Sequence, residues 1–528
     1  MSGEDICAVC QQPAQQKCSA CKLVFYCSRE HQKCHWKEHA SYCRPFKIDR
    51  DDTLGRHYIA TRKIEKGEVI LRERTPLVAG PPVETPPVCL GCYGILQADN
   101  AKPCDKCGWP LCGACQGHGG ECQFTTQFRD SKVSVTEFGC PHPTYRCINI
   151  VRALALRESD PKAYQRFLEL QGQCPNDDDS LDCNRGEEHK ALASFVKRFF
   201  KIDHIKSEEI IKIAGILQIN GHEVPTTEPP HMAVYDGASY FEHSCHANSS
   251  KSFTEKGGLI IRAAVTINEG DHISMCYTDP LWGIANRRHY LLQTKFFHCQ
   301  CTRCSDATEF GTMYNGLKCS RSNCCGTMLP PTFLVRDNEK CPDYFCNKCD
   351  ETMTWQAVDA KLEQIGIELA SMKKNDVNEC MRFLNKYSKV LHENHFYMVD
   401  VKLAMSQMIG QQAGGLAAVS DEMLSEKISL CKKLDELFRI LMPAENRLRG
   451  LVLFEVHAAI AEFGRRQGPD QLRGMLMLSR TALREAYELL RHEPDILPEG
   501  KIARIANKNL VEMDTIIKTL CQNAATPM

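Results

Sequence analysis

The sequence predicts a multidomain α+β protein with a β-rich, metal-stabilised front part and an all-helical back part. Of the 32 cysteines among the 528 residues, 29 lie before residue 350, many of them in closely spaced pairs. Residues 53–82 and 257–281 alternate apolar and polar side chains around glycine turns, a pattern typical of short strands. From residue 356 onward apolar residues recur at helical spacing, which favours an array of paired helices.

Composition and charge argue against a nucleic-acid-binding or membrane-spanning protein. The formal net charge of −1 and the isoelectric point near 7.0 provide no overall attraction for nucleic acid or an anionic membrane. The N-terminus has no cationic and apolar leader pattern, and no run approaches the about 18 apolar residues of a bilayer span. We therefore expect an intracellular monomer, cytoplasmic and/or nuclear, in which paired cysteines bind metal rather than form disulfides.

The first cysteine array has the spacing of two interleaved zinc sites. Zinc takes four soft or borderline ligands in a tetrahedron, and a CxxC turn brings two thiolates to one ion. If the sites interleave, one ion binds Cys7, Cys10, Cys27 and His31, and the other binds Cys18, Cys21, His39 and Cys43. Cys34 is then a spare thiol.

A second array repeats this scheme, and its closing HGGEC matches the HASYC of the first in spacing. The predicted sites are Cys89, Cys92, Cys112 and Cys115 for one ion, and Cys104, Cys107, His118 and Cys122 for the other. Fingers this small bury too little apolar surface to fold alone, so metal binding must supply their folding free energy.

Two more cysteine knuckles, about twenty residues apart, predict a zinc-ribbon-like site. The predicted ligands are Cys319, Cys324, Cys346 and Cys349. Cys325 competes with its neighbour Cys324 for one of these places.

Several stretches follow one another in an order that belongs to a known family. They are "GRHYIATRKIEKGEVIL" from Gly55, "LQINGHEV", "FEHSCHAN", "GDHISMCYTD" and "FFHCQCTRC". This order resembles the opening turn, core motifs, active-site strand and post-SET segment of the SET-and-MYND (SMYD) protein-lysine methyltransferases, arthropod-type branch. The array at 7–43 resembles a MYND zinc finger, and the array at 89–122 stands where the family inserts its own.

The resemblance implies a domain organisation. It comprises a MYND-type finger (1–46), the N-terminal SET part (47–84), an inserted MYND-type finger (85–124), a helical insert (125–220), the SET core (221–284), a post-SET and zinc-ribbon-like segment (285–355) and a helical domain similar to tetratricopeptide arrays (356–528).

The family transfers a methyl group from S-adenosylmethionine to a lysine amine. By resemblance, Tyr277 is the catalytic residue that orients the amine and the methyl group. The implied cofactor-binding residues are Gly55, Arg56, Asn220, Glu242, His243 and Phe297. Cys245 would join Cys299, Cys301 and Cys304 around one structural zinc.

Three positions depart from the family pattern. Glu242 stands in place of an asparagine, His57 in place of a glycine, and Lys295 in place of a tyrosine that lines the lysine tunnel. Two function classes therefore follow: a methyltransferase acting on a histone or another protein, and a zinc-stabilised scaffold that keeps the SET fold without its cofactor pocket. In either class the fingers and the helical domain would bind a protein or peptide partner.

Overall fold

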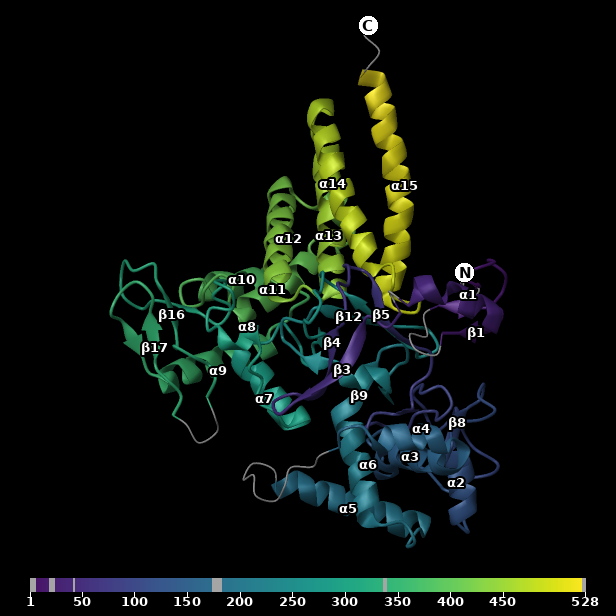
Figure 1. The fold of residues 1–528 in the computed structure, drawn as a ribbon. Coiled ribbons are helices and arrows are strands. Elements are labelled where there is room, and N and C mark those ends of the chain that lie inside the picture. The colour runs from purple at the N-terminus through teal and green to yellow at the C-terminus, as the bar shows by residue number, and fades with distance from the viewer. Residues whose placement is uncertain (1–5, 19–23, 41–42, 173–182, 336–339, 525–528) are drawn as a thin grey trace.

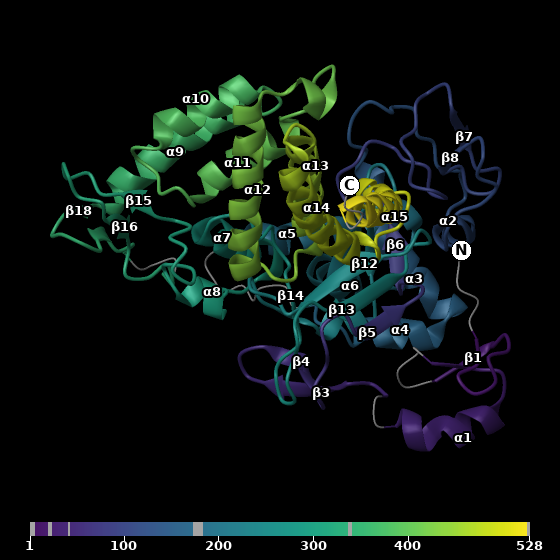
Figure 2. The same cartoon turned by 90° about the horizontal axis from the view of Figure 1, so that it is seen from above.

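The computed structural model describes residues 6–18, 24–40, 43–172, 183–335 and 340–524. It confirms the predicted class, because small β-sheets occupy the front of the chain and long helices the back (Figure 1). The N-terminal finger and the sheet β15–β18 lie at opposite ends of the molecule in both ribbon views (Figures 1 and 2).

The N-terminal finger consists of one short hairpin and one helix. Strands β1 (Gln16–Lys17) and β2 (Phe25–Tyr26) pair antiparallel, and helix α1 (Arg29–His39) follows. Ser28 caps this helix by accepting the backbone N–H of His31 at 3.2 Å. The cap fixes the first turn of α1, from which His31 projects.

The β-rich core is made of four small sheets. Their strands are β3 (Phe46–Asp51), β4 (Gly55–Ala60), β5 (Val69–Glu73), β6 (Val78–Gly80), β9 (Gly221–Val224), β10 (His231–Val234), β11 (Glu242–His243), β12 (Ser249–Phe253), β13 (Leu259–Ala263) and β14 (Ser274–Met275). The sheets have the orders β3-β4, β12-β13-β5 and β6-β10-β9, and β11 pairs parallel with β14. The sequence predicts β4 and β5 as consecutive strands, and the structure places them in different sheets: β4 pairs with β3 and β5 with β13.

The second array and the helical insert share one hydrophobic core. Their elements are β7 (Ala101–Pro103), β8 (Pro110–Cys112), α2 (Glu121–Phe128), α3 (Ile148–Ser159), α4 (Pro161–Leu168), α5 (Cys183–Phe200) and α6 (Ser207–Asn220). Trp109 is fully buried in this core, and its indole N–H donates to Thr125 Oγ1 at 2.8 Å. The finger is therefore packed into the insert and is not a separate module on a linker.

Behind the core, α7 (Ile284–Lys295) and α8 (Thr302–Ser305) lead to a four-stranded sheet of β15 (Leu317–Lys318), β16 (Thr327–Leu329), β17 (Tyr344–Cys346) and β18 (Thr352–Met353). The helical domain then comprises α9 (Trp355–Ser371), α10 (Val377–Tyr387), α11 (Phe396–Met408), α12 (Asp421–Leu441), α13 (Asn446–Arg465), α14 (Pro469–Leu490) and α15 (Pro498–Ala524). Helices α13 and α14 approach closely at Gly450, where a Cβ atom would lie 2.4 Å from Leu490 Cγ. A larger residue at this position would have to displace the Leu490 side chain.

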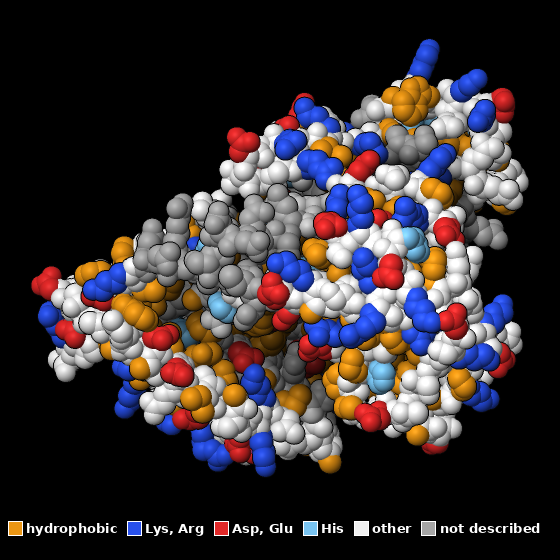
Figure 3. Space-filling view, turned by 90° about the horizontal axis from the view of Figure 1, so that it is seen from below, with side chains coloured by type: hydrophobic (Ala, Val, Ile, Leu, Met, Phe, Trp, Pro, Cys, Tyr) orange, Lys and Arg blue, Asp and Glu red, His pale blue; other side chains and the backbone are white. Residues whose placement is uncertain are grey.

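The surface carries charges of both signs. On the face seen in Figure 3, lysines and arginines lie among acidic side chains and small apolar patches, and no single sign dominates. No helix among the described residues is both long and apolar enough to span a membrane.

Candidate metal centres and cofactor site

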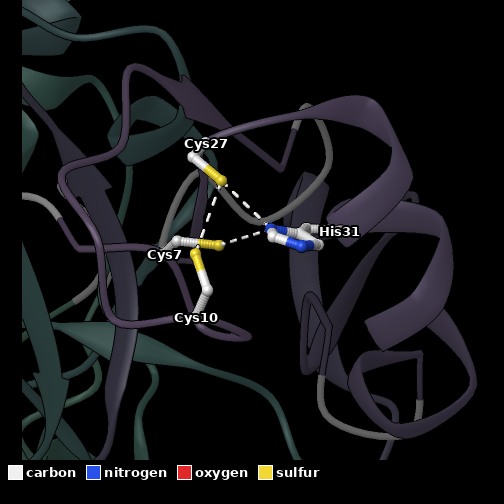
Figure 4. Close-up of side chains that lie close together, drawn as sticks. All are labelled: Cys7, Cys10, Cys27 and His31. Carbon is white, nitrogen blue, oxygen red and sulfur yellow. Dashed lines mark hydrogen bonds between the residues drawn. The ribbon is translucent and has the colours of Figure 1, made fainter.

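The first predicted metal site comes together in the N-terminal finger (Figure 4). The ligand atoms of Cys7, Cys10, Cys27 and His31 all lie within 4.8 Å of one another. His31 Nδ1 is 3.0 Å from Cys27 Sγ and 3.5 Å from Cys7 Sγ. Three sulfur atoms and one imidazole nitrogen form the donor set of a structural zinc site.

The second site of this finger is partly outside the described residues. Cys18 Sγ and Cys43 Sγ are 3.6 Å apart, and His39 is buried on α1. Cys21 lies outside the described residues, so its place in this site stays a prediction.

The second array forms both of its predicted groups. Cys89, Cys92, Cys112 and Cys115 are one group, and Cys104, Cys107, His118 and Cys122 are the other, each within 4.8 Å. A hydrogen bond from the backbone N–H of Ala114 is the main cause that lowers the pKa of Cys112 to about 7, which favours the thiolate that zinc requires.

A buried ion pair supports this second group. His118 Nε2 lies 3.2 Å from Cys107 Sγ, and its Nδ1 lies 2.7 Å from Glu121 Oε1. Arg152 binds the same carboxylate through two contacts of 2.6 Å, and it also donates to the carbonyls of Ala79 and Leu90. A carboxylate that accepts a hydrogen bond from the other ring nitrogen of a histidine ligand fixes the tautomer and the orientation of that histidine. The sequence analysis missed this role, although Glu121 stands three residues after His118.

The post-SET group connects two distant segments. Cys245, in the loop after β11, meets Cys299, Cys301 and Cys304 within 4.8 Å. Cys245 Sγ is 3.5 Å from Cys304 Sγ and 3.9 Å from Cys299 Sγ. Arg287 donates to Cys304 Sγ at 3.7 Å, and this buried cation offsets the negative charge of the thiolates.

The fifth group distinguishes between the two adjacent cysteines. Cys319, Cys324, Cys346 and Cys349 lie within 4.8 Å of one another. Cys325 is exposed, and its Sγ instead accepts from Lys348 Nζ at 3.1 Å. The geometry therefore favours Cys324 as the ligand.

The predicted catalytic tyrosine lies next to this post-SET group. The Tyr277 hydroxyl donates to the carbonyl of Phe241, and its backbone N–H donates to His243 Nδ1 at 3.0 Å. The His243 ring is 5.3 Å from the Tyr277 ring and 5.7 Å from the Phe297 ring, measured between centroids. Burial raises the pKa of Tyr277 and lowers the pKa of His243 to about 4, so both side chains are neutral near pH 7.

Three more of the predicted cofactor residues, Gly55, Arg56 and Asn220, lie around the segment that follows α4. Gly55 adopts a φ of +68° at the start of β4, and Arg56 donates to the carbonyl of Glu169. Asn220, the last residue of α6, donates both amide protons to carbonyls, at 2.8 Å to Gln171 and 2.9 Å to Ile216. Only the Asn220 side-chain oxygen is left for a ligand.

Two of the three residues that depart from the family pattern, Glu242 and His57, contact His272, which the sequence analysis missed. Glu242 Oε2 lies 2.9 Å from His272 Nδ1, and the buried His57 ring stacks on His272 at 4.5 Å between centroids. His57 Nδ1 also lies 3.8 Å from an Asp51 carboxylate oxygen. No local pattern reveals His272, because strand pairing alone brings it here.

Comparison with known proteins gives two family matches. Residues 7–43 match the MYND finger model, and residues 55–278 match the SET domain model. The SET domain-containing protein SmydA-8, isoform A, of Drosophila melanogaster is 25% identical over 379 residues, covering 67% of this chain and 76% of the relative. Histone-lysine N-methyltransferase ASHR1 of Arabidopsis thaliana is 22% identical, covering 76% of this chain and 83% of its own. Histone-lysine N-methyltransferase SMYD3 of Mus musculus is 24% identical, and the match covers 49% of this chain and 48% of the relative.

Proposed function

We propose that this chain, which belongs to the SET-and-MYND (SMYD) family, transfers a methyl group from S-adenosylmethionine to a lysine side chain of a protein. The observation that carries the proposal is the convergence of Tyr277, His243 and Phe297 beside the Cys245 group. Methyl transfer depends chiefly on holding two reactants in line, so rigid placement counts for more than acid or base groups. A half-buried tyrosine whose hydroxyl donates to a backbone carbonyl and whose ring lies against His243 meets that need.

The residues present fit the cofactor, which supplies an activated methyl group on a sulfonium sulfur. We assign the Phe297 ring to stack on its adenine, with Gly55 and Arg56 approaching through their backbone. Asn220 would accept a hydrogen bond through its free side-chain oxygen. Both His243 ring nitrogens already face protein atoms, Tyr277 N and Cys245 Sγ, so its contact with the cofactor would come from its backbone.

The substrate would approach between the SET core and the helical domain. A cavity of about 210 Å³ lies there, lined by Lys251, Met275 and Cys276 on one side and by Glu445 and Arg447 on the other. Cys276 directly precedes Tyr277 in the chain, so the cavity wall is one residue away in sequence from the predicted catalytic tyrosine. A cleft with both charge signs suits a polypeptide chain.

The geometry favours the enzyme over the non-catalytic scaffold. Two of the departures that suggest a lost pocket, Glu242 and His57, are held by His272 in contacts of their own. The residues that would hold the reactants remain together.

Calorimetric titration with S-adenosylmethionine tests the proposal. We expect saturable binding by the wild type and by Tyr277→Phe, whereas Tyr277→Phe should methylate a mixture of lysine-containing proteins at least about 100-fold more slowly. The matched control is Tyr145→Phe, which also loses a hydroxyl that donates to a backbone carbonyl, Val88 O at 2.6 Å. Both variants should lose about 1 kcal/mol of stability, and only the first should lose activity. Absence of binding heat in the wild type would leave the scaffold as the remaining function.

Zinc content is a separate prediction. We propose that the 24 predicted ligands fill six sites, since zinc takes four ligands each. Inductively coupled plasma mass spectrometry of the purified protein should find about six zinc ions per chain, five in Cys319→Ser, and six in the control Cys325→Ser. A value near two in the wild type would contradict the assignment.

A further inference from the structure

Lys295 holds an amine beside the catalytic tyrosine. It is the last residue of α7, and Lys295 Nζ lies 5.9 Å from the centroid of the Tyr277 ring. The next residue, Phe296, ends the helix with a φ of +60°, a left-handed conformation that is rare for a bulky side chain. This turn directs Lys295 and Phe297 to neighbouring parts of the same site.

The amine is held by two backbone carbonyls. Lys295 Nζ donates to Ile219 O at 2.8 Å and to Gln218 O at 3.2 Å, at the C-terminal end of α6. These two residues directly precede Asn220. A neutral amine has two N–H groups and one lone pair. Two carbonyl partners therefore satisfy both N–H groups and leave the lone pair in the remaining tetrahedral direction.

Burial also raises the fraction of Lys295 that is present as the neutral amine. Burial and the nearby charge of Lys251 lower the pKa of Lys295 to about 8. At pH 7 about one tenth of such a group is neutral, compared with less than about one thousandth of an ordinary lysine. A methyl acceptor must be neutral to use its lone pair.

We propose that Lys295 is itself a methyl acceptor, so that the chain methylates its own lysine beside Tyr277. The inference rests on the proposed methyltransferase function and adds a modification site to it. The lone pair of Lys295 Nζ forms a bond to the methyl carbon while the carbon–sulfur bond breaks, and the bonding pair stays on sulfur. S-adenosylhomocysteine leaves, and Lys295 becomes a methylammonium.

The two carbonyls also determine where the reaction stops. A monomethylammonium still carries two N–H groups, one for each of Gln218 O and Ile219 O. A dimethylammonium carries one, and a part-buried carbonyl would lose its partner. The product is therefore monomethyl-lysine.

The test uses the full-length, zinc-loaded protein and S-adenosylmethionine with a deuterated methyl group. After proteolysis, mass spectrometry should find a single deuterated methyl group on Lys295, formed at a rate per chain that does not depend on protein concentration. Lys295→Arg keeps a cation for the two carbonyls but has no neutral amine, and the label at this position should be lost. The matched control is Lys402→Arg, because Lys402 Nζ also donates to a backbone carbonyl, Glu393 O at 2.6 Å, and does not line the cleft. This variant should keep the label on Lys295, and Tyr277→Phe should lose it.

The outcomes separate this inference from the proposed function. If the wild type binds S-adenosylmethionine and methylates added protein while Lys295 stays unlabelled, the inference is overturned and the proposed function stands. If the chain binds no S-adenosylmethionine, the proposed function itself is overturned. Equal labelling of Lys295 in the wild type and in Tyr277→Phe would show alkylation without the enzyme's site, which also overturns the inference.

Discussion

Replacement of Cys245 by serine should release one zinc ion and strongly destabilise the SET core. Cys245 belongs to the loop after β11, and its three partners lie more than fifty residues later in the chain, at 299–304. The four sulfur atoms therefore hold the post-SET segment against the strand that carries His243. A structural zinc site contributes about 10–16 kcal/mol of apparent binding free energy, so the loss of one of four ligands should cost about 3 kcal/mol or more.

The measurements for Cys245→Ser are zinc content, thermal unfolding and binding of S-adenosylmethionine. We expect one zinc ion fewer, a lower unfolding temperature and weaker binding, because Phe297 precedes Cys299 by two residues and depends on the same group for its position. The control is Cys147→Ser, which changes another buried thiol, one that donates to Thr144 O at 2.8 Å. This control should keep the full zinc content and lose about 1 kcal/mol. Equal losses in the two variants would show that Cys245 acts as a core residue and not as a ligand.

The metal groups could be predicted from the sequence because most of their ligands lie close together in the chain. A CxxC pair must lie within one turn, and two interleaved pairs leave few ways to build two tetrahedra. Spacing alone therefore selected the groups of the second array that the structure brings together. Spacing could not choose between Cys324 and Cys325, because adjacent residues differ only in side-chain direction. The folded structure separates them, since Cys324 joins the other three sulfur atoms while Cys325 is exposed and contacts Lys348.

The candidate cofactor site could be predicted only in part. Tyr277, His243 and Phe297 were found from motif order, and the structure places them together. The partners of Glu242 and Lys295 were not found, since His272 and the carbonyls of α6 come from distant segments. Strand β3 was also missed, because five of its six residues are exposed and the apolar alternation in its sequence FKIDRD stops after Ile48. These contacts and this strand depend on segments that meet only in the folded protein, and the local sequence pattern does not encode them.

Replacement of Glu121 by glutamine should be nearly as damaging as the loss of a zinc ligand. Glu121 has no exposed side-chain surface, and Arg152 has 8%. Burial opposes the charge of Glu121, but Arg152 and His118 outweigh it and lower the pKa of Glu121 to about 2. Loss of one partner from a buried ion pair leaves the other charge uncompensated and costs about 3–5 kcal/mol. The pKa of the folded state lies below the ordinary 4.5, so this stabilisation is present above pH 4.5 and is lost as the pH falls toward 2.

Glu121→Gln should also weaken zinc binding at the Cys104 group. The variant keeps the size of the side chain but removes the carboxylate that faces His118 Nδ1, and loss of such a partner lowers metal affinity by about 10- to 100-fold. Denaturant unfolding and competition with a chelator measure the two effects separately. The control is Glu65→Gln, which breaks the exposed pair with Lys63 at 2.7 Å and should leave both the stability and the zinc affinity nearly unchanged. Because Arg152 lies on α3 of the helical insert, a large effect would mean that the second finger and the insert fold as one unit. A cost for Glu121→Gln no larger than that for Glu65→Gln would mean that the finger is held by metal alone.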